Sequence, residues 1–291
     1  MDNERKLRGL VEAFDACDSR YKRQEMEEAA ALQTGITPYL IQILEDLAAD
    51  PEAYSLDGNY ANVYAVALLA HFQEPAAHQP IIKAFLIDKK NLDELWGDMV
   101  TETLPALLFQ TCNGSLDEIK RLILNKDAHE YVRGAAVGAL TYAVARGVAE
   151  RQETVDFLAA LFTGSEAEED SYFWSNIAAS IADLHPEGAM DNVRDAFARG
   201  LIHPDYVGLG EIEADCKKPK ETLLEELRRK ADYGIPRDIH GYLSWFSCFH
   251  DERDFRPVEP FNNTKVQKKK KTVSRVKRKM AKQSRKKNRK K

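Results

Sequence analysis

The feature that most constrains the fold of this chain is a recurring pair of helices. A stretch that is apolar on most sides, YANVYAVALLAHF from Tyr60 to Phe72, is followed by the candidate partner helix AAHQPIIKAFL. Further first helices are predicted to begin near Val100, Glu130 and Ser171, each followed by its own partner. A period of about 30–45 residues is typical of stacked helical repeats. Because strand-like alternation is nearly absent, the sequence predicts an all-α helical-repeat solenoid. An irregular helical bundle is the alternative.

Small residues in the first helices favour close packing between neighbouring units. Gly134 and Gly138 lie within one predicted helix, together with Ala136. A glycine in a helix interior costs about 1 kcal/mol relative to alanine. We therefore expect the helix backbones to approach each other closely along this stretch.

Two helix starts are predicted from capping residues. Thr37 is a candidate N-cap with Pro38 at the first helical position, because proline is tolerated there. Ser115 and Glu118 have the spacing of a capping box at the start of a second helix.

One helix pair carries a family resemblance. The segment DAHEYVRGAAVGAL resembles a HEAT-type repeat of the phycobilisome-lyase kind at Asp127, Val132, Arg133, Ala136, Ala139 and Leu140. The order of ITPYLIQILED, YAVALLAHFQEP, GDMVTETLPALL, EYVRGAAVGAL and LIHPDYVGLGEIE is similar to a bacterial family of unknown function built on such helices. The resemblance spans roughly Glu25 to Phe249 and implies a HEAT-like fold without implying a reaction. Members of that family often end in a SEC-C zinc motif, but no cysteine follows Cys248 here.

Charge is divided unequally along the chain. Residues 265–291 contain 16 of the 42 lysines and arginines and no acidic residue, so the rest of the chain carries a net charge of −21. A segment so charged and so poor in apolar residues is typical of disorder. The sequence therefore predicts a helical-repeat body over 1–232, an aromatic-rich capping segment over 233–264 and a disordered basic tail over 265–291.

The basic tail is predicted to bind the phosphates of RNA or DNA without base specificity, with the ribosome as one setting. An anionic membrane surface is a second candidate, at about 1 kcal/mol per basic residue. The third is a solvated segment that binds any polyanion weakly, the acidic body included. The candidate nucleic-acid-binding residues are Lys268, Lys269, Lys270, Lys271, Arg275, Lys277, Arg278, Lys279, Lys282, Arg285, Lys286, Lys287, Arg289, Lys290 and Lys291.

The segment before the tail is dense in aromatic residues. We expect it to cap the last repeat, whose core face is otherwise exposed. The alternative is a docking surface for a partner helix or peptide. Its candidate partner-binding residues are Trp245, Phe246 and Phe249.

The sequence holds no short catalytic or nucleotide-binding motif. An enzyme acting through the turn from His203 to Glu213 is the runner-up, with Asp205 and Glu211 as further acid–base groups. The favoured interpretation of these residues is a structural turn with helix-capping carboxylates. The acidic runs near Glu25, Ser165 and Glu211 are interpreted as solvated faces, unless the fold brings them together into one negative groove.

No metal or cofactor is predicted. The four cysteines are far apart, and the spacing of His240, Cys248 and His250 fits no compact ligand pattern. The start of the chain is charged, and no stretch approaches the roughly 20 apolar residues of a membrane span. We therefore expect a cytoplasmic, non-enzymatic scaffold or adaptor with an unknown protein partner, and the sequence leaves its oligomeric state open.

Overall fold

The secondary structure of the chain is helical throughout the part that the computed structural model describes, which comprises residues 2–18, 20–55, 58–243, 246 and 249. These residues contain fifteen α-helices, two short 3-10 helices and no strand. The first α-helices are α1 (Asp2–Phe14), α2 (Arg23–Ala31), α3 (Gln33–Ala49), α4 (Ala61–His71), α5 (His78–Phe85), α6 (Lys89–Leu95), α7 (Met99–Glu102) and α8 (Leu104–Thr111). They are followed by α9 (Asp117–Leu124), α10 (Glu130–Ala145), α11 (Arg151–Ala160), α12 (Tyr172–Asp183), α13 (Met190–Ala198), α14 (Leu209–Cys216) and α15 (Lys220–Gly234). The 3-10 helices are η1 (Pro51–Tyr54) and η2 (Pro75–Ala77).

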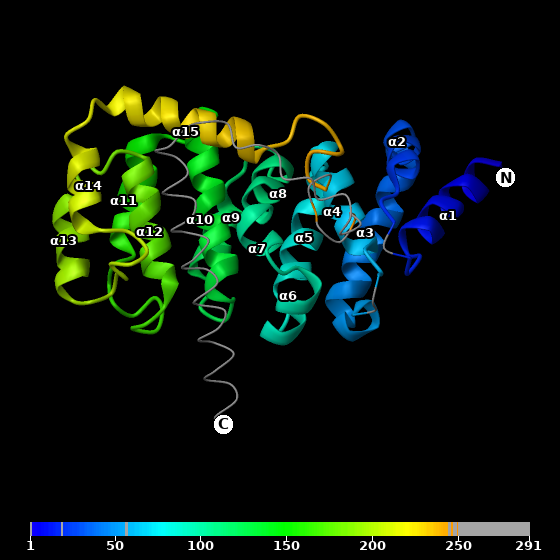
Figure 1. Ribbon diagram of the computed structural model, residues 1–291, viewed down its shortest axis with the longest axis horizontal. Coiled ribbons are helices and arrows are strands. Elements are labelled where there is room, and N and C mark those ends of the chain that lie inside the picture. Colours follow the sequence, from blue (N-terminus) through cyan, green and yellow to red (C-terminus); the bar gives the residue numbers. More distant parts are fainter. Residues whose placement is uncertain (1, 19, 56–57, 244–245, 247–248, 250–291) are drawn as a thin grey trace.

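Helices α1 to α14 follow one another broadly in chain order along the long axis of the molecule (Figure 1). Helices α4, α8, α10 and α12, each the first helix of a predicted pair, contact one another in sequence. Each also contacts at least one neighbouring shorter helix. The predicted first helices near residues 60, 100, 130 and 171 are thus present, as are their partners α5, α9, α11 and α13. The prediction of an all-helical fold is confirmed for the described residues.

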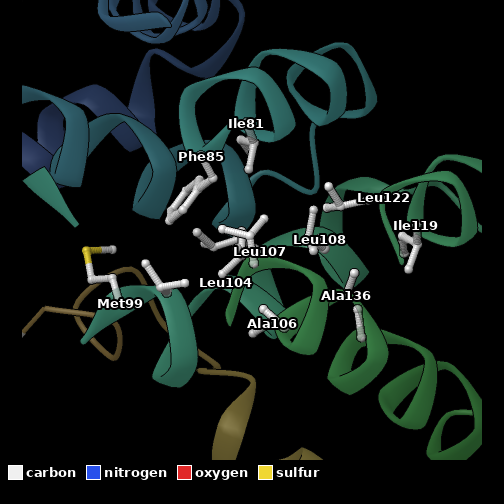
Figure 2. Packing of buried hydrophobic residues seen from close by; sticks show 14 of the residues in the cluster. Ile81, Phe85, Met99, Leu104, Ala106, Leu107, Leu108, Ile119, Leu122 and Ala136 are labelled. Atoms are coloured by element: carbon white, nitrogen blue, oxygen red, sulfur yellow. The ribbon is translucent and has the colours of Figure 1, made fainter. Parts of the chain in front are cut away.

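A single hydrophobic core runs through these stacked helices. Figure 2 shows part of it, where side chains from α5, α7, α8, α9 and α10 meet. Leu104, Leu107 and Ala136 are fully buried there. The core is continuous because α4, α8, α10 and α12 contact one another in series and all contribute buried apolar residues to it. Helix α4 is buried on nearly all sides, as its all-round apolar pattern requires.

The glycines of α10 lie at close approaches of this helix to two of its neighbours, α12 and α8. A Cβ atom on Gly134 would lie 2.6 Å from Nδ2 of Asn176 on α12. A Cβ atom on Gly138 would lie 3.3 Å from the ring of Pro105 on α8. The expected role of these glycines in close packing is confirmed.

The two capping predictions were wrong about where the helices begin. Helix α3 begins at Gln33, so Pro38 lies inside it and the Thr37 hydroxyl donates to the Gln33 carbonyl instead of capping the helix. The earlier start is possible because Leu32 separates α2 from α3 and its carbonyl already accepts from the backbone N–H groups of the new turn. Helix α9 begins at Asp117 without a side-chain cap.

Helix α15 lies across the row of helices rather than extending it (Figure 1). It contacts α10 and α12, and two ion pairs link its second half to them. Lys230 pairs with Asp183 at 2.5 Å, and Asp232 pairs with Arg146 at 3.0 Å. A Cβ atom on Gly234 would lie 2.1 Å from the hydroxyl of Tyr142, so α15 ends in close contact with α10.

The chain after α15 returns to the N-terminal helices. The ring of His240 lies between the Tyr21 hydroxyl, 2.5 Å from Nδ1, and the Glu27 carboxylate, 3.3 Å from Nε2. The Phe249 ring packs on Tyr21 and on Tyr64 of α4. The expectation that this segment covers the last repeat is therefore wrong for its described residues.

Candidate partner-binding face

A row of aromatic rings follows successive repeats across one side of the body. The ring centroids of Tyr131 on α10 and Tyr172 on α12 are 6.4 Å apart. Tyr172 stacks on His203 at 4.6 Å and contacts Tyr206 at 6.1 Å. We call Tyr131, Tyr172, His203, Tyr206 and the adjoining Asn176 the tyrosine face.

Helix capping fixes the position of the two tyrosines that begin this row. His129 is the N-cap of α10, where its Nδ1 accepts from the backbone N–H of Tyr131 at 3.3 Å. The Glu130 carboxylate then accepts from the Ser171 hydroxyl at 2.6 Å and from the Tyr172 N–H at 2.8 Å. Because one carboxylate joins the starts of both helices, their tyrosines are held in register.

Tyr206 is held on the same face by a hydrogen bond to α12. Its hydroxyl donates to Oδ1 of Asn176 at 2.6 Å, and the Asn176 side chain lies directly over Gly134. Tyr206 as a whole is 40% exposed, one of few large apolar side chains so exposed among the described residues. The hydroxyl is thus satisfied within the protein while a large part of the residue faces solvent.

Carboxylates surround the tyrosines. Burial, reinforced by Glu130 and Asp93, raises the pKa of Tyr131 to about 12. The pKa of Tyr172 and that of Tyr206 are also raised, first by burial and then by nearby carboxylates. All three phenols therefore stay protonated at neutral pH. The face offers aromatic surface and hydroxyl groups in a negative field, and this suits binding better than proton abstraction.

The acid–base candidates predicted in the turn from His203 to Glu213 have structural partners. Nε2 of His203 donates to the Asp170 carbonyl at 3.1 Å. Glu213 pairs with Arg194 at 3.1 Å, and a Glu211 oxygen lies 3.5 Å from the backbone N–H at the start of α14. The prediction of a structural turn with a capping carboxylate is confirmed for Glu211. Asp205 is exposed and lies beside the tyrosine face.

The three acidic runs do not converge. Glu25 belongs to α2 and Glu211 to α14, and these helices stand near opposite ends of the row (Figure 1). The groove that would require all three runs is therefore not formed.

No metal site is found among the described residues, where no three histidine, cysteine or acidic side chains are grouped to hold an ion. Both ring nitrogens of His240 already contact protein groups, the Tyr21 hydroxyl and the Glu27 carboxylate. Cys248 and His250 lie outside the described residues. No helix in the described part of the chain is both long and apolar enough to span a membrane.

The other predicted site residues are placed as follows. Phe249 lies in the aromatic cluster on α4, and Phe246 stacks on Phe249 with ring centroids 6.3 Å apart. Trp245 and every candidate nucleic-acid-binding residue of the tail lie outside the described residues. Partner binding by the aromatic segment and nucleic-acid binding by the tail stay predictions.

Sequence reasoning missed the tyrosine face. Tyr131 and Tyr172 each lie within two residues of the start of a first helix. An aromatic residue that recurs at the start of successive repeats was therefore the signal that could have identified them. Tyr206 carries no such signal because it precedes α14 in a loop.

Comparisons with known proteins match most of the chain. Uncharacterised proteins of Chlamydia trachomatis serovar D and Chlamydia muridarum are each 30% identical to this chain over 230 residues, which is 78% of this chain and 90% and 91% of theirs. No solved structure matches the chain. A family model described as a protein of unknown function (DUF1186) matches residues 6–250, a range that contains the tyrosine face and ends before the basic tail. The chain belongs to this DUF1186 family.

Proposed function

We propose that the protein is a non-enzymatic adaptor with two binding surfaces of opposite charge. The helical body, which we infer to be a HEAT-like solenoid, binds a protein partner on the tyrosine face. The basic tail, residues 265–291, binds RNA or DNA through phosphates. The observation that carries the proposal is the contrast between a partly exposed aromatic face with carboxylates beside it and a segment of 16 basic residues without an acidic one.

The chemistry of the tyrosine face supports a binding role. Tyrosine supplies large amphipathic contact area at low conformational cost and is enriched at protein interfaces. The phenols on this face are protonated at neutral pH, and the neighbouring His203 and Glu211 have structural partners. A set of such groups can hold a partner but offers no activated nucleophile.

The composition of the tail supports binding to a polyanion. Lysine and arginine gain affinity for nucleic acid mainly by displacing counterions, so binding weakens steeply with salt. The tail contains no aromatic residue on which a base could stack, so little base specificity is expected.

A salt titration of the full chain with a single-stranded RNA tests the nucleic-acid half of the proposal. If about eight basic residues meet phosphates, the slope of log affinity against log salt is about −6, at roughly −0.7 per contact. Replacing Lys268, Lys269, Lys270 and Lys271 by Gln in the full chain is expected to reduce this slope by about 3.

A charge-matched variant provides the control. Replacing the exposed body residues Lys83, Lys90, Lys217 and Lys220 by Gln removes the same charge. This variant is expected to keep the slope of the unmodified protein. Equal effects of the two variants, or binding that ignores salt, would show that the tail is not the nucleic-acid-binding segment.

A further inference from the structure

We propose that the tyrosine face is the docking surface for the chain's own basic tail, residues 265–291. The inference rests on the proposed binding role of this face and adds the identity of its occupant. When the tail docks on its own chain, the face and nucleic acid compete for the same lysines and arginines.

The charges around the face favour a cationic occupant. Asp93, Asp170 and Asp205 are exposed and lie near enough to Tyr131 or Tyr172 to affect their electrostatics. Two basic residues lie near the face. Lys230 is paired with Asp183, and Lys89 stands near the exposed Asp93 at the His129 end of the row.

The ring system suits the same occupant. Arginine and lysine bind over tyrosine rings, most favourably where carboxylates stand beside the ring. Tyr206 presents such a ring, because its hydroxyl is fixed by Asn176 while the residue is 40% exposed. The tail offers four arginines and twelve lysines and has no acidic side chain that would be repelled by the carboxylates around the face.

The chain is long enough to reach this face. The last described residue, Phe249, packs on Tyr64 of α4. Three successive helix contacts lead from α4 through α8 and α10 to α12, or about 30 Å at 8–10 Å per contact. The 16 residues that lead from Phe249 to Lys265 span up to about 50 Å when extended. A tethered segment within reach has an effective concentration on the order of millimolar, so weak individual contacts suffice.

Zero-length carbodiimide cross-linking of the full chain tests the docking directly, because it joins lysine amines to carboxylates in contact. At low salt, tail lysines are expected to cross-link to Asp93, Asp170 or Asp205 at least about fivefold more often than to Glu12 or Glu52, which are also exposed. Adding a single-stranded oligouridylate is expected to abolish this preference. Raising the salt until it screens the attraction between tail and carboxylates is expected to do the same. Cross-links spread over exposed carboxylates without preference would overturn the proposal.

Mixing unlabelled and nitrogen-15-labelled protein separates docking in cis from docking between chains. Cross-links within one chain support the proposal, whereas mixed-isotope cross-links alone would overturn it in favour of a second copy.

A pair of matched variants gives an independent readout. The double variant Tyr206→Ala, Asp205→Asn removes one ring and one carboxylate from the face. It is expected to raise the affinity of the full chain for oligouridylate several-fold, because the tail no longer has to leave its docking surface. The control Tyr233→Ala, Glu52→Gln removes the same groups elsewhere, where Tyr233 is 86% exposed, and is expected to leave the affinity unchanged. Equal affinities of both variants and the unmodified protein would overturn the proposal.

The two proposals fail separately. If the four-lysine tail variant binds RNA as well as the unmodified protein does, the nucleic-acid role fails, while cross-linking still reports on docking. If RNA binding requires the tail but the cross-links show no preference, only the docking proposal fails.

Discussion

At His78, the hydrogen bonds of one neighbour determine which ring nitrogen carries the proton. The Thr111 hydroxyl donates to the Leu107 carbonyl at 2.8 Å, so it can only accept from Nδ1 of His78, 2.9 Å away. Nδ1 is therefore protonated in the neutral ring, and Nε2 is buried without a hydrogen-bond partner. Burial is the main cause that lowers the pKa of His78.

This arrangement predicts a loss of stability in acid. A histidine whose pKa is lower in the folded than in the unfolded state contributes fully to stability above the unfolded pKa, about 6.5. That contribution is lost as the pH falls from the unfolded pKa through the folded one. The free energy of unfolding by denaturant should thus be smaller at pH 5.5 than at pH 7.5. His71 and His129, whose pKa values are also lowered by burial, add to the effect.

Two variants assign the effect to His78. His78→Gln is expected to reduce the difference between the two pH values, because it removes one of the three groups that must be protonated. His203→Gln should leave the difference unchanged, since the His203 ring lies on the tyrosine face and donates to the Asp170 carbonyl. A difference that His78→Gln does not alter would contradict the assignment.

Ala136 is a second residue whose surroundings predict a measurable loss. It is fully buried in the core shown in Figure 2, so Ala136→Glu places a carboxylate where water cannot reach. We expect it to lower the free energy of unfolding by more than about 3 kcal/mol. Ala214→Glu, in an exposed position of α14, is the matched control and should cost less than about 1 kcal/mol. A similar cost for both would place Ala136 outside the core.

At the scale of elements, the position of the C-terminal end of α15 depends on the close contact between Gly234 and Tyr142. Its missing Cβ leaves room for the Tyr142 hydroxyl, so Gly234→Ala must displace either Tyr142 or the end of α15. Overpacking of this kind costs about 1–3 kcal/mol. Urea unfolding should show that loss for Gly234→Ala but not for Gly210→Ala, whose new methyl group meets no atom within 4 Å. Equal stability of the two variants would show that α15 adjusts without cost.

Periodicity predicted most of the helices but not the way they begin or cross. The pairs from α4 to α13 were predictable because the apolar spacing within each helix reflects which side it buries. The start of α3 was predicted too late, since a proline can stand inside a helix once the preceding turn is bonded to Leu32. The crossing of α15 brings together, in two ion pairs, residues that are 47 and 86 positions apart, and no local pattern encodes such contacts.

At the scale of the whole molecule, the segment after α15 joins regions that are far apart in the sequence. His240 and Tyr21 are separated by 219 residues, yet their side chains share a hydrogen bond. The density of aromatic residues in this segment predicted a cap on the last repeat, whereas its described residues pack on the N-terminal helices. The choice between the two ends of the body was not predictable, because an aromatic ring fits any complementary apolar surface. The tyrosine face was hidden for a related reason, since it is assembled from two helix starts and a loop.

This return contact predicts that the N-terminal helices do not unfold independently. In a stack whose repeats touch only their neighbours, the ends fray without affecting the rest. Here the rings of Tyr21, Tyr64 and Phe249 join the first helices to the segment after α15. Phe249→Ala should therefore increase amide hydrogen exchange both in α2 and in residues 235–243, while exchange in α11 and α13 stays unchanged.

A second aromatic truncation distinguishes this coupling from a general loss of stability. Phe157→Ala removes a half-buried ring from α11, which lies away from the return contact. It is expected to increase exchange in α11 and its neighbours α12 and α13, leaving α2 protected. If Phe249→Ala raised exchange evenly along the chain, or only around residue 249 itself, the segment after α15 would not couple the two regions. The selective result would show that the chain closes on its own N-terminal helices, and the segment that leads to the basic tail would then start from a fixed point at Phe249.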